Sequence, residues 1–135
     1  MITKFGKLPS VFARIKGKSG VTMEYDCLID PASEYCTVPK VDAYTLGYPE
    51  VGFQHATVAP PNSRTFLTNG GHNRTVIVNM NSVEIGALKF EDVQFAPFDL
   101  PQASRYEALI GKSLLERASM TINWPDRTIG LVKLA

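Results

Sequence analysis

A single carboxylate, Asp30, lies where a reactive group would be placed, at the end of a short apolar run. The run at 27–29 has the character of a buried strand, and the small residues Pro31, Ala32 and Ser33 follow Asp30 at once. A carboxylate at the exit of a buried strand is costly unless it is hydrogen-bonded or paired. Asp30 is therefore the first functional candidate in the chain. The alternative is an ordinary Asp-Pro turn that joins two strands.

The other reactive side chains form no recognisable catalytic or metal-binding pattern. Cys27 and Cys36 flank the Asp30 turn, and an intracellular protein of this size needs no disulfide, so both are predicted to be small buried hydrophobes. Neither cysteine has a histidine nearby in sequence, which disfavours a thiol nucleophile. His55 and His72 lie far from the cysteines and from each other, so we expect no metal and no cofactor.

The composition is that of one globular domain. A length of 135 residues predicts a single domain over residues 1–135, and the 44% apolar and 20% charged content argues against disorder. The formal net charge is +1 with scattered Lys and Arg, so neither nucleic acid nor an anionic membrane is expected as a partner. No apolar run approaches the roughly 18 residues of a membrane span. Residues 1–7 lack the apolar core of a secretion signal, and a cytoplasmic location is expected.

Short strands are predicted to position Asp30. The signals are alternating apolar residues bounded by Gly, Pro and Asn turns. The predicted strands are residues 9–16, 21–29, 35–38, 51–59, 64–68, 74–80, 83–85, 88–95, 106–110, 119–124 and 128–133. A kink is expected at Asn81 and Ser82.

Two short helices are predicted among these strands. The first begins at Pro39, ends at a C-cap at Gly47, and is expected to bury four apolar side chains. These four are Val41, Ala43, Tyr44 and Leu46. The second begins after Gly111. Many short strands with two short helices predict an all-β domain, either a closed barrel or a sandwich.

Three motifs, in this order, resemble those of the retropepsin-like aspartic proteases. The first is the apolar run ending in Asp30 and followed by small residues, where the family has Asp-Thr/Ser-Gly-Ala/Ser. The second is the Gly-rich hairpin at 68–71, placed where the family carries its flap. The third is the block 108–115 with the following 120–124 and 129–131. It is similar to the family's two apolar residues, Gly, a basic or polar pair, Leu and a closing β-hairpin.

The resemblance runs from about Val11 to the C-terminus, and it implies a retropepsin-like fold and an aspartic endopeptidase. In that family each chain supplies one aspartate, so a homodimer assembles the catalytic pair. One carboxyl activates a water molecule, and the other, protonated, polarises the scissile carbonyl of a peptide or protein substrate. The closing strand, residues 129–132, is expected to pair between subunits.

The resemblance also implies roles for individual residues, with Asp30 as the catalytic acid. Residues implied to bind substrate are Ala32, Ser33, Thr68, Asn69, Gly70 and Gly71. Residues implied to support the site are Pro31, Glu34, Leu109, Ile110, Gly111 and Lys112. Glu34 and Lys112 match positions that often form an ion pair in retroviral members, and the alternative is two unrelated surface charges.

The chain departs from the family at two positions. Pro31 stands at the family's Thr, which exchanges hydrogen bonds with the partner loop through its hydroxyl and its N–H, and proline has neither. Ala32 stands at the family's Gly and adds a Cβ where backbone and water must approach closely. A catalytically inactive dimerisation or peptide-binding module is therefore the alternative function. A small β-barrel binding module without a carboxylate pair is the alternative from another class.

Overall fold

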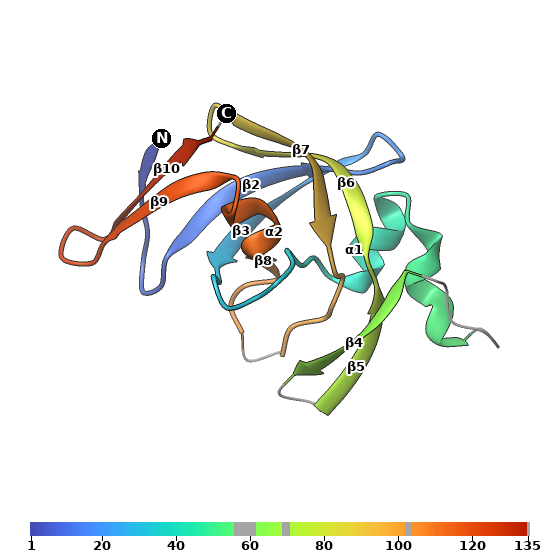
Figure 1. Cartoon of the computed structure of the whole chain (residues 1–135). Coiled ribbons are helices and arrows are strands. Elements are labelled where there is room, and N and C mark those ends of the chain that lie inside the picture. Colours follow the sequence, from blue (N-terminus) through green and yellow to red (C-terminus); the bar gives the residue numbers. More distant parts are fainter. Residues whose placement is uncertain (56–61, 69–70, 102–103, 135) are drawn as a thin grey trace.

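The structure, a computed structural model, describes residues 1–55, 62–68, 71–101 and 104–134, and strands dominate it (Figure 1). The strands are β1 (Ile2–Lys4), β2 (Ser10–Lys16), β3 (Thr22–Ile29), β4 (Ser63–Thr68), β5 (Gly71–Val76), β6 (Val78–Ile85), β7 (Leu88–Phe95), β8 (Ala108–Ile110), β9 (Ala118–Asn123) and β10 (Thr128–Lys133). The helical elements are α1 (Lys40–Thr45), the 3₁₀-helix η1 (Pro49–His55) and α2 (Lys112–Leu115). The all-β class is confirmed.

The strands form three sheets with distinct places in the molecule. The central sheet has the order β7-β6-β2-β3-β8, and its β3–β8 pair is parallel while its other pairs are antiparallel. A terminal sheet has the order β1-β10-β9. The two-stranded sheet β4-β5 projects from the body as a hairpin (Figure 1). The central sheet is curled. Its β3–β8 pair brings the end of β3 beside the segment that continues from β8 into α2.

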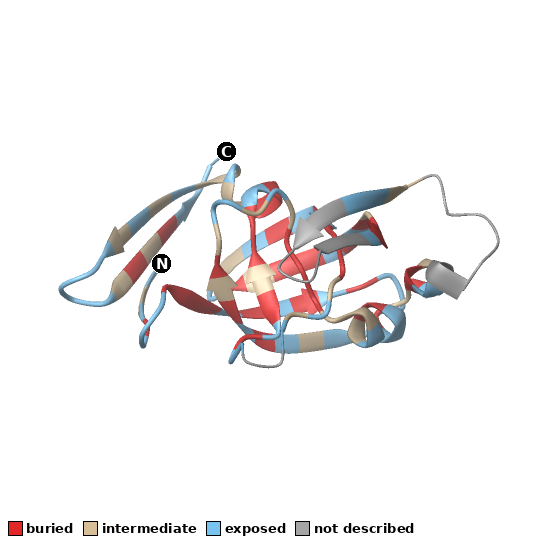
Figure 2. Ribbon diagram, turned by 90° about the horizontal axis from the view of Figure 1, so that it is seen from below, coloured by how far each residue is buried: buried red, intermediate tan, exposed pale blue. Residues whose placement is uncertain are grey.

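Alternation along β2 follows the prediction. Val11, Ala13 and Ile15 are buried, whereas the residues between them are exposed, because successive side chains of a strand point to opposite faces. Figure 2 shows the same alternation of buried and exposed positions along other strands. Gly17 ends β2, where a Cβ would lie 2.2 Å from the carbonyl oxygen of Leu46, so only glycine fits this approach.

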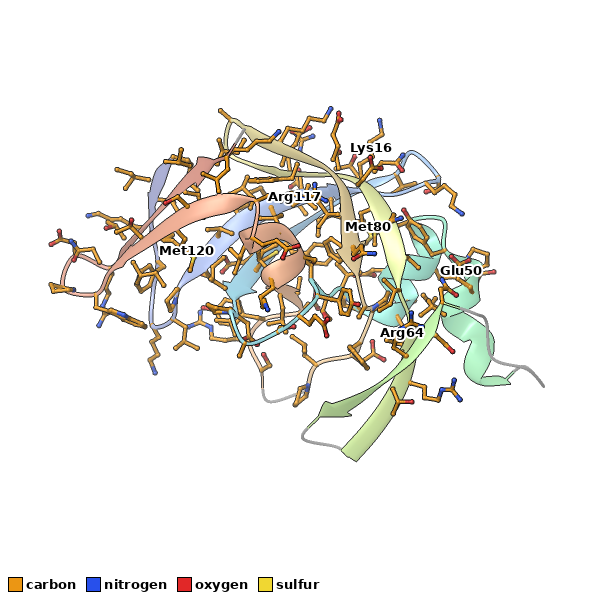
Figure 3. The ribbon with its side chains drawn as sticks, viewed as in Figure 1. Lys16, Glu50, Arg64, Met80, Arg117 and Met120 are labelled. Carbon is orange, nitrogen blue, oxygen red and sulfur yellow. The ribbon has the colours of Figure 1, made fainter. Side chains whose placement is uncertain are left out.

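A single hydrophobic core lies between the central sheet and the segments that cover it. Its largest fully buried side chains come from strands, helices and the segments between them, and one of these side chains is Met80 of β6 (Figure 3). Others are Tyr48, Phe90, Phe95, Ile15, Leu46, Ile110 and Leu114. Burial of each such side chain contributes about 1.5–3 kcal/mol to stability, so the core holds the strand ends that carry the candidate site.

Helix α1 buries only half of its predicted apolar face. Ala43 and Leu46 are fully buried, but Val41 and Tyr44 are 70% and 62% exposed, so the prediction was wrong for these two. A six-residue helix lying on the surface buries one narrow row, and positions 43 and 46 fill it. Gly47 has φ +108° and its N–H donates to the carbonyl of Tyr44 at 3.1 Å, which ends the helix as predicted.

The strand predicted over 51–59 is wrong where the structure describes it. Residues 49–55 form η1, with Pro49 at its first position and Val51 buried. Proline suits the first turn of a helix because no N–H is needed there. Within 51–55 the alternation consists of Val51 and Phe53 alone, and two apolar residues are too few to distinguish a strand from a helical turn. Residues 56–61 lie outside the described part of the chain.

The strand predicted over 35–38 is reduced to two isolated bridges. Cys36 pairs with Phe95 in parallel and Thr37 pairs with Leu109 in antiparallel. This segment crosses between β7 and β8 and meets each strand at one residue only, so no regular ladder develops. Its hydrogen bonds are nevertheless reciprocal, since Thr37 and Leu109 exchange both N–H···O bonds at 3.0 Å.

The break expected at Asn81 and Ser82 lies instead at Ile77. Strand β6 runs continuously from Val78 to Ile85, and β5 ends at Val76. Ile77 donates its N–H to the carbonyl of Asn62 at 2.9 Å and accepts a bond from the Asn62 side-chain amide at 2.8 Å. This pair of bonds closes the base of the β4–β5 hairpin, so the hairpin and the central sheet are separate at this point.

Strand β10 lies in the middle of the terminal sheet. β1 pairs with one edge of it, with Ile2 opposite Gly130, and β9 pairs with the other edge. Phe5 is buried and meets Trp124 edge-on, with ring centroids 5.7 Å apart. The edges of this sheet are therefore β1 and β9, and the closing strand, β10, is paired on both sides within the chain.

No helix among the described residues is long and apolar enough to cross a membrane.

Candidate active site

Asp30 leaves the sheet at the end of β3, where parallel pairing with β8 fixes its backbone. The last pair of the ladder joins Ile29 with Ile110, and the Asp30 N–H donates to the Ile110 carbonyl at 2.9 Å. The Asp30 side chain is half-buried. Its Oδ1 accepts the N–H of Ala32 at 3.1 Å, so one carboxylate oxygen is held by the loop that follows it. Asp30 is thus a positioned carboxylate at the sheet edge.

The loop after Asp30 is a tight turn closed by short-range hydrogen bonds. The Ser33 N–H donates to the Asp30 carbonyl at 3.1 Å, and the Ser33 hydroxyl donates to the Tyr35 carbonyl at 2.7 Å. Pro31 and Ala32 are exposed at the tip of this turn. Proline fixes its own φ near the value that such a turn requires, so the turn forms without the residues that the family normally places there.

The first turn of α2 donates backbone hydrogen bonds to this loop. The Lys112 N–H donates to the Ser33 carbonyl at 2.8 Å, and the Ser113 N–H donates to the Glu34 carbonyl at 3.0 Å. The first N–H groups of a helix have no partner within it, and here the loop carbonyls accept two of them. Ile110, Gly111 and Lys112 therefore lie against the Asp30 loop, and Leu109 pairs with Thr37 just after it.

Gly111 is the point of closest approach between the two segments. A Cβ at this position would lie 2.3 Å from the Tyr35 carbonyl oxygen and 2.7 Å from that of Ser33. Real Cβ atoms are not found so close to backbone oxygen, and neither carbonyl can move without breaking the loop. Glycine at 111 is thus required by space alone.

Two buried polar groups in this region were not predicted from sequence. The Ser113 hydroxyl accepts the Cys36 N–H at 3.2 Å and donates to the Gln94 carbonyl at 2.7 Å. The Cys36 sulfur accepts the Gly111 N–H at 3.4 Å. A serine just before Leu114 and Leu115 in the first turn of a short helix is the only signal in the sequence, and it does not reveal partners so far away in the chain.

The cysteines have the character predicted for them. Cys27 and Cys36 are both buried and both free of disulfides. Burial raises the pKa of each thiol, so both stay protonated at neutral pH. A thiolate nucleophile is not available at either position.

Glu34 and Lys112 are exposed, and their side chains form no ion pair in the described structure. Backbone bonds join their segments instead. The salt bridge present in the described part of the chain lies elsewhere, between Arg14 and Glu24 at 3.4 Å, and both side chains are half exposed. The alternative of separate surface charges therefore describes Glu34 and Lys112 in this structure.

The hairpin predicted at 68–71 is present in its arms. Strands β4 and β5 are antiparallel, and Thr68 opposite Gly71 is the last pair before the connection. Asn69 and Gly70 lie outside the described residues. At the hairpin base the buried Thr75 hydroxyl donates to the Pro97 carbonyl at 2.7 Å. Arg64 lies on β4 near this base (Figure 3).

Within the described residues no group of three or more His, Cys, Asp and Glu side chains could hold a metal ion.

Comparisons with known proteins agree with this geometry. No family model and no curated protein sequence matches the chain. Among solved structures, the chain is similar to a retropepsin-like aspartic protease from Rickettsia conorii, with a TM-score of 0.63 and 23% sequence identity. The match covers 98% of this chain and 97% of that one. The chain has the retropepsin-like fold. The fold expected from the three motifs is thus confirmed over nearly the whole length.

Replacing Gly111 by Ala tests the close approach below the Asp30 loop. We expect Gly111→Ala to lower the free energy of unfolding by about 2–3 kcal/mol, because the new Cβ overlaps two backbone carbonyls. Gly6→Ala is the matched control, since a Cβ at Gly6 meets nothing within 4 Å. Urea denaturation measures both. Equal stability of the two variants would contradict the crowding at Gly111.

Proposed function

We propose that this protein is an aspartic endopeptidase that works as a homodimer. The observation that carries the proposal is the position of Asp30. Asp30 is half-buried at the end of β3, its Oδ1 is held by the Ala32 N–H, and the loop that follows it is bonded to the N–H groups that follow Gly111. The similar Rickettsia conorii protein is described as an aspartic protease, which supports the same chemistry on this fold.

The chemistry requires two copies of Asp30. Two carboxyl groups a few Å apart across a two-fold axis cannot both ionise, so the pair holds one proton. The ionised carboxylate takes a proton from a water molecule that attacks the scissile carbonyl, and the protonated carboxyl donates a hydrogen bond to that carbonyl oxygen. The Ala32 N–H keeps one Asp30 oxygen in place during this step.

The substrate would be an extended peptide segment of a protein. In this proposal Ala32 and Ser33 line the floor of the cleft, and the β4–β5 hairpin, with Thr68, Asn69, Gly70 and Gly71 at its tip, closes over the peptide. Backbone hydrogen bonds from an extended hairpin suit a peptide of many sequences, and closure excludes water from the reacting bond.

The exposed face of the terminal sheet is the proposed dimer surface. Ile2 lies opposite Gly130, so it shares a face with Val132. These side chains are 80% and 62% exposed, and Leu134 just beyond β10 is also exposed. Because β1 occupies one edge of β10 within the same chain, a second copy would add to the β1 or β9 edge or cover this face.

The second candidate, a catalytically inactive dimerisation or peptide-binding module, is favoured by Pro31. Its ring removes an N–H and its side chain lacks a hydroxyl at the residue that faces the partner's loop. Such a protein would dimerise and bind peptides without cleaving them.

Substituting Asp30 separates these two candidates. We expect Asp30→Asn to abolish cleavage of an unstructured protein while fold and dimer are kept, because Asn cannot accept the water's proton. Circular dichroism, sedimentation and a gel-based cleavage assay measure the three properties. Asp26→Asn, at an exposed position of β3, is the control, and this variant should cleave the substrate normally. A wild-type protein that cleaves nothing across the pH range would leave the inactive module as the better description.

Dimerisation has its own test. Analytical ultracentrifugation should find a dimer, and Ile2→Lys with Val132→Lys should shift it to monomer by adding charges to the apolar face. Val41→Lys with Tyr44→Lys places the same charges on the exposed apolar side chains of α1, away from the terminal sheet, as a comparison. A wild type that remains monomeric at high concentration would rule out a site built from two chains.

The atypical turn offers a third test. We expect Pro31→Thr with Ala32→Gly to tighten the dimer about tenfold and to raise cleavage, because each restored hydrogen bond between loops contributes about 1 kcal/mol. The dimer dissociation constant and kcat/KM are measured for this variant and for a control, Pro125→Thr, which replaces a proline in a distant turn. A less stable protein with no gain would mean that the loop is built around proline.

A further inference from the structure

We propose that Ser113 is a positioning residue. By holding the end of the loop that begins at Asp30, it determines where the Asp30 carboxylate lies. This inference rests on the proposed function. Ser113 does not touch the position of the substrate, and it acts through the backbone of the loop that carries Asp30.

The loop has a fixed beginning and a fixed end. Its beginning is the Asp30 N–H, which β8 holds through the Ile110 carbonyl at 2.9 Å. Its end is the Cys36 N–H, which the Ser113 hydroxyl accepts at 3.2 Å. Between these two bonds lie five residues, and two of their carbonyls, those of Ser33 and Glu34, accept hydrogen bonds from N–H groups of α2.

The Ser113 hydroxyl connects this end to a third element. It donates its single proton to the Gln94 carbonyl on β7 at 2.7 Å, which is the shorter of its two bonds to oxygen or nitrogen partners. Its own N–H donates to the Glu34 carbonyl at 3.0 Å. One buried side chain therefore joins α2, the loop and β7, and β7 belongs to the central sheet that also holds β3.

The sulfur of Cys36 takes part in the same arrangement. It lies 3.5 Å from the Ser113 oxygen and accepts the Gly111 N–H at 3.4 Å. The Ser113 hydroxyl and the Cys36 thiol thus stand side by side beneath the loop, and both satisfy backbone N–H groups that are buried. A buried N–H without a partner is costly, so loss of the hydroxyl favours displacement of the loop end.

Neighbouring bonds limit the size of that displacement. Thr37 donates its hydroxyl to the Ala96 carbonyl at 2.9 Å, and Ala96 donates its N–H to the Cys36 carbonyl at 2.9 Å. These contacts keep the segment after the loop on β7 and β8. Removal of the Ser113 hydroxyl is therefore expected to shift the loop without unfolding the domain.

The experiment compares three substitutions in the full chain. Ser113→Ala removes the hydroxyl, Ser113→Cys keeps nearly the same volume with weaker hydrogen bonds, and Ser113→Thr restores the hydroxyl. Ser82→Ala is the matched control, a buried serine on β6 away from the loop. Amide hydrogen exchange at Ala32 reports the bond to Asp30 Oδ1 directly, and kcat and KM are measured on a cleaved peptide.

We expect Ser113→Ala and Ser113→Cys to speed exchange at Ala32 and to lower kcat about tenfold, with KM changed less than about twofold. Ser113→Thr should restore both, and Ser82→Ala should change neither. Unchanged Ala32 exchange in Ser113→Ala and Ser113→Cys would overturn the inference. If Ser113→Ala does not fold, Ser113→Cys decides by the same measurements. Exchange is read without activity, so an inactive wild type would count against the endopeptidase alone.

Discussion

The parallel contact between β3 and β8 is the interaction on which the rest of the site depends. Parallel strands cannot be joined by a short turn, so the chain travels through the hairpin, β6 and β7 before β8 returns beside β3. That return delivers the Ile110 carbonyl to Asp30 and the Gly111 turn to the loop carbonyls. Local sequence places a carboxylate after a strand, but only this distant contact gives it a fixed position.

The sequence predicted the parts of this site that depend on local rules. The strand before Asp30, the turn after it and the strand–glycine–helix at 108–115 all follow from short-range patterns of apolar residues, Pro and Gly. Prediction from the sequence failed where the structure of a residue depends on contacts with residues far away in the chain. Residues 49–55 form η1, not a strand, because Pro49 suits the first turn of a helix and Val51 packs on the core, and Val41 and Tyr44 proved exposed because a short helix buries a single row. Ser113 and Cys36 gain their roles only after folding.

The Asp30 turn shows how one loop can keep its shape with different residues. The Asp30 Oδ1 accepts the Ala32 N–H, which needs no particular side chain, and the Ser33 N–H closes the turn onto the Asp30 carbonyl. Proline strengthens this local turn while removing groups that would face outwards. The shape of the loop therefore depends on backbone hydrogen bonds and on proline, and not on the side chain at position 32.

The strand order of the terminal sheet affects the order in which parts of the chain can fold during synthesis. Its middle strand, β10, contains residues 128–133, and both β1 and β9 pair with it. During synthesis β1 leaves the ribosome before β10 and has no partner until residues 128–130 have followed, and closing so long a loop is a slow step. The Asp30 loop needs nothing beyond α2, so it is complete earlier. The Asp30 carboxylate is thus held in place before the terminal sheet is assembled.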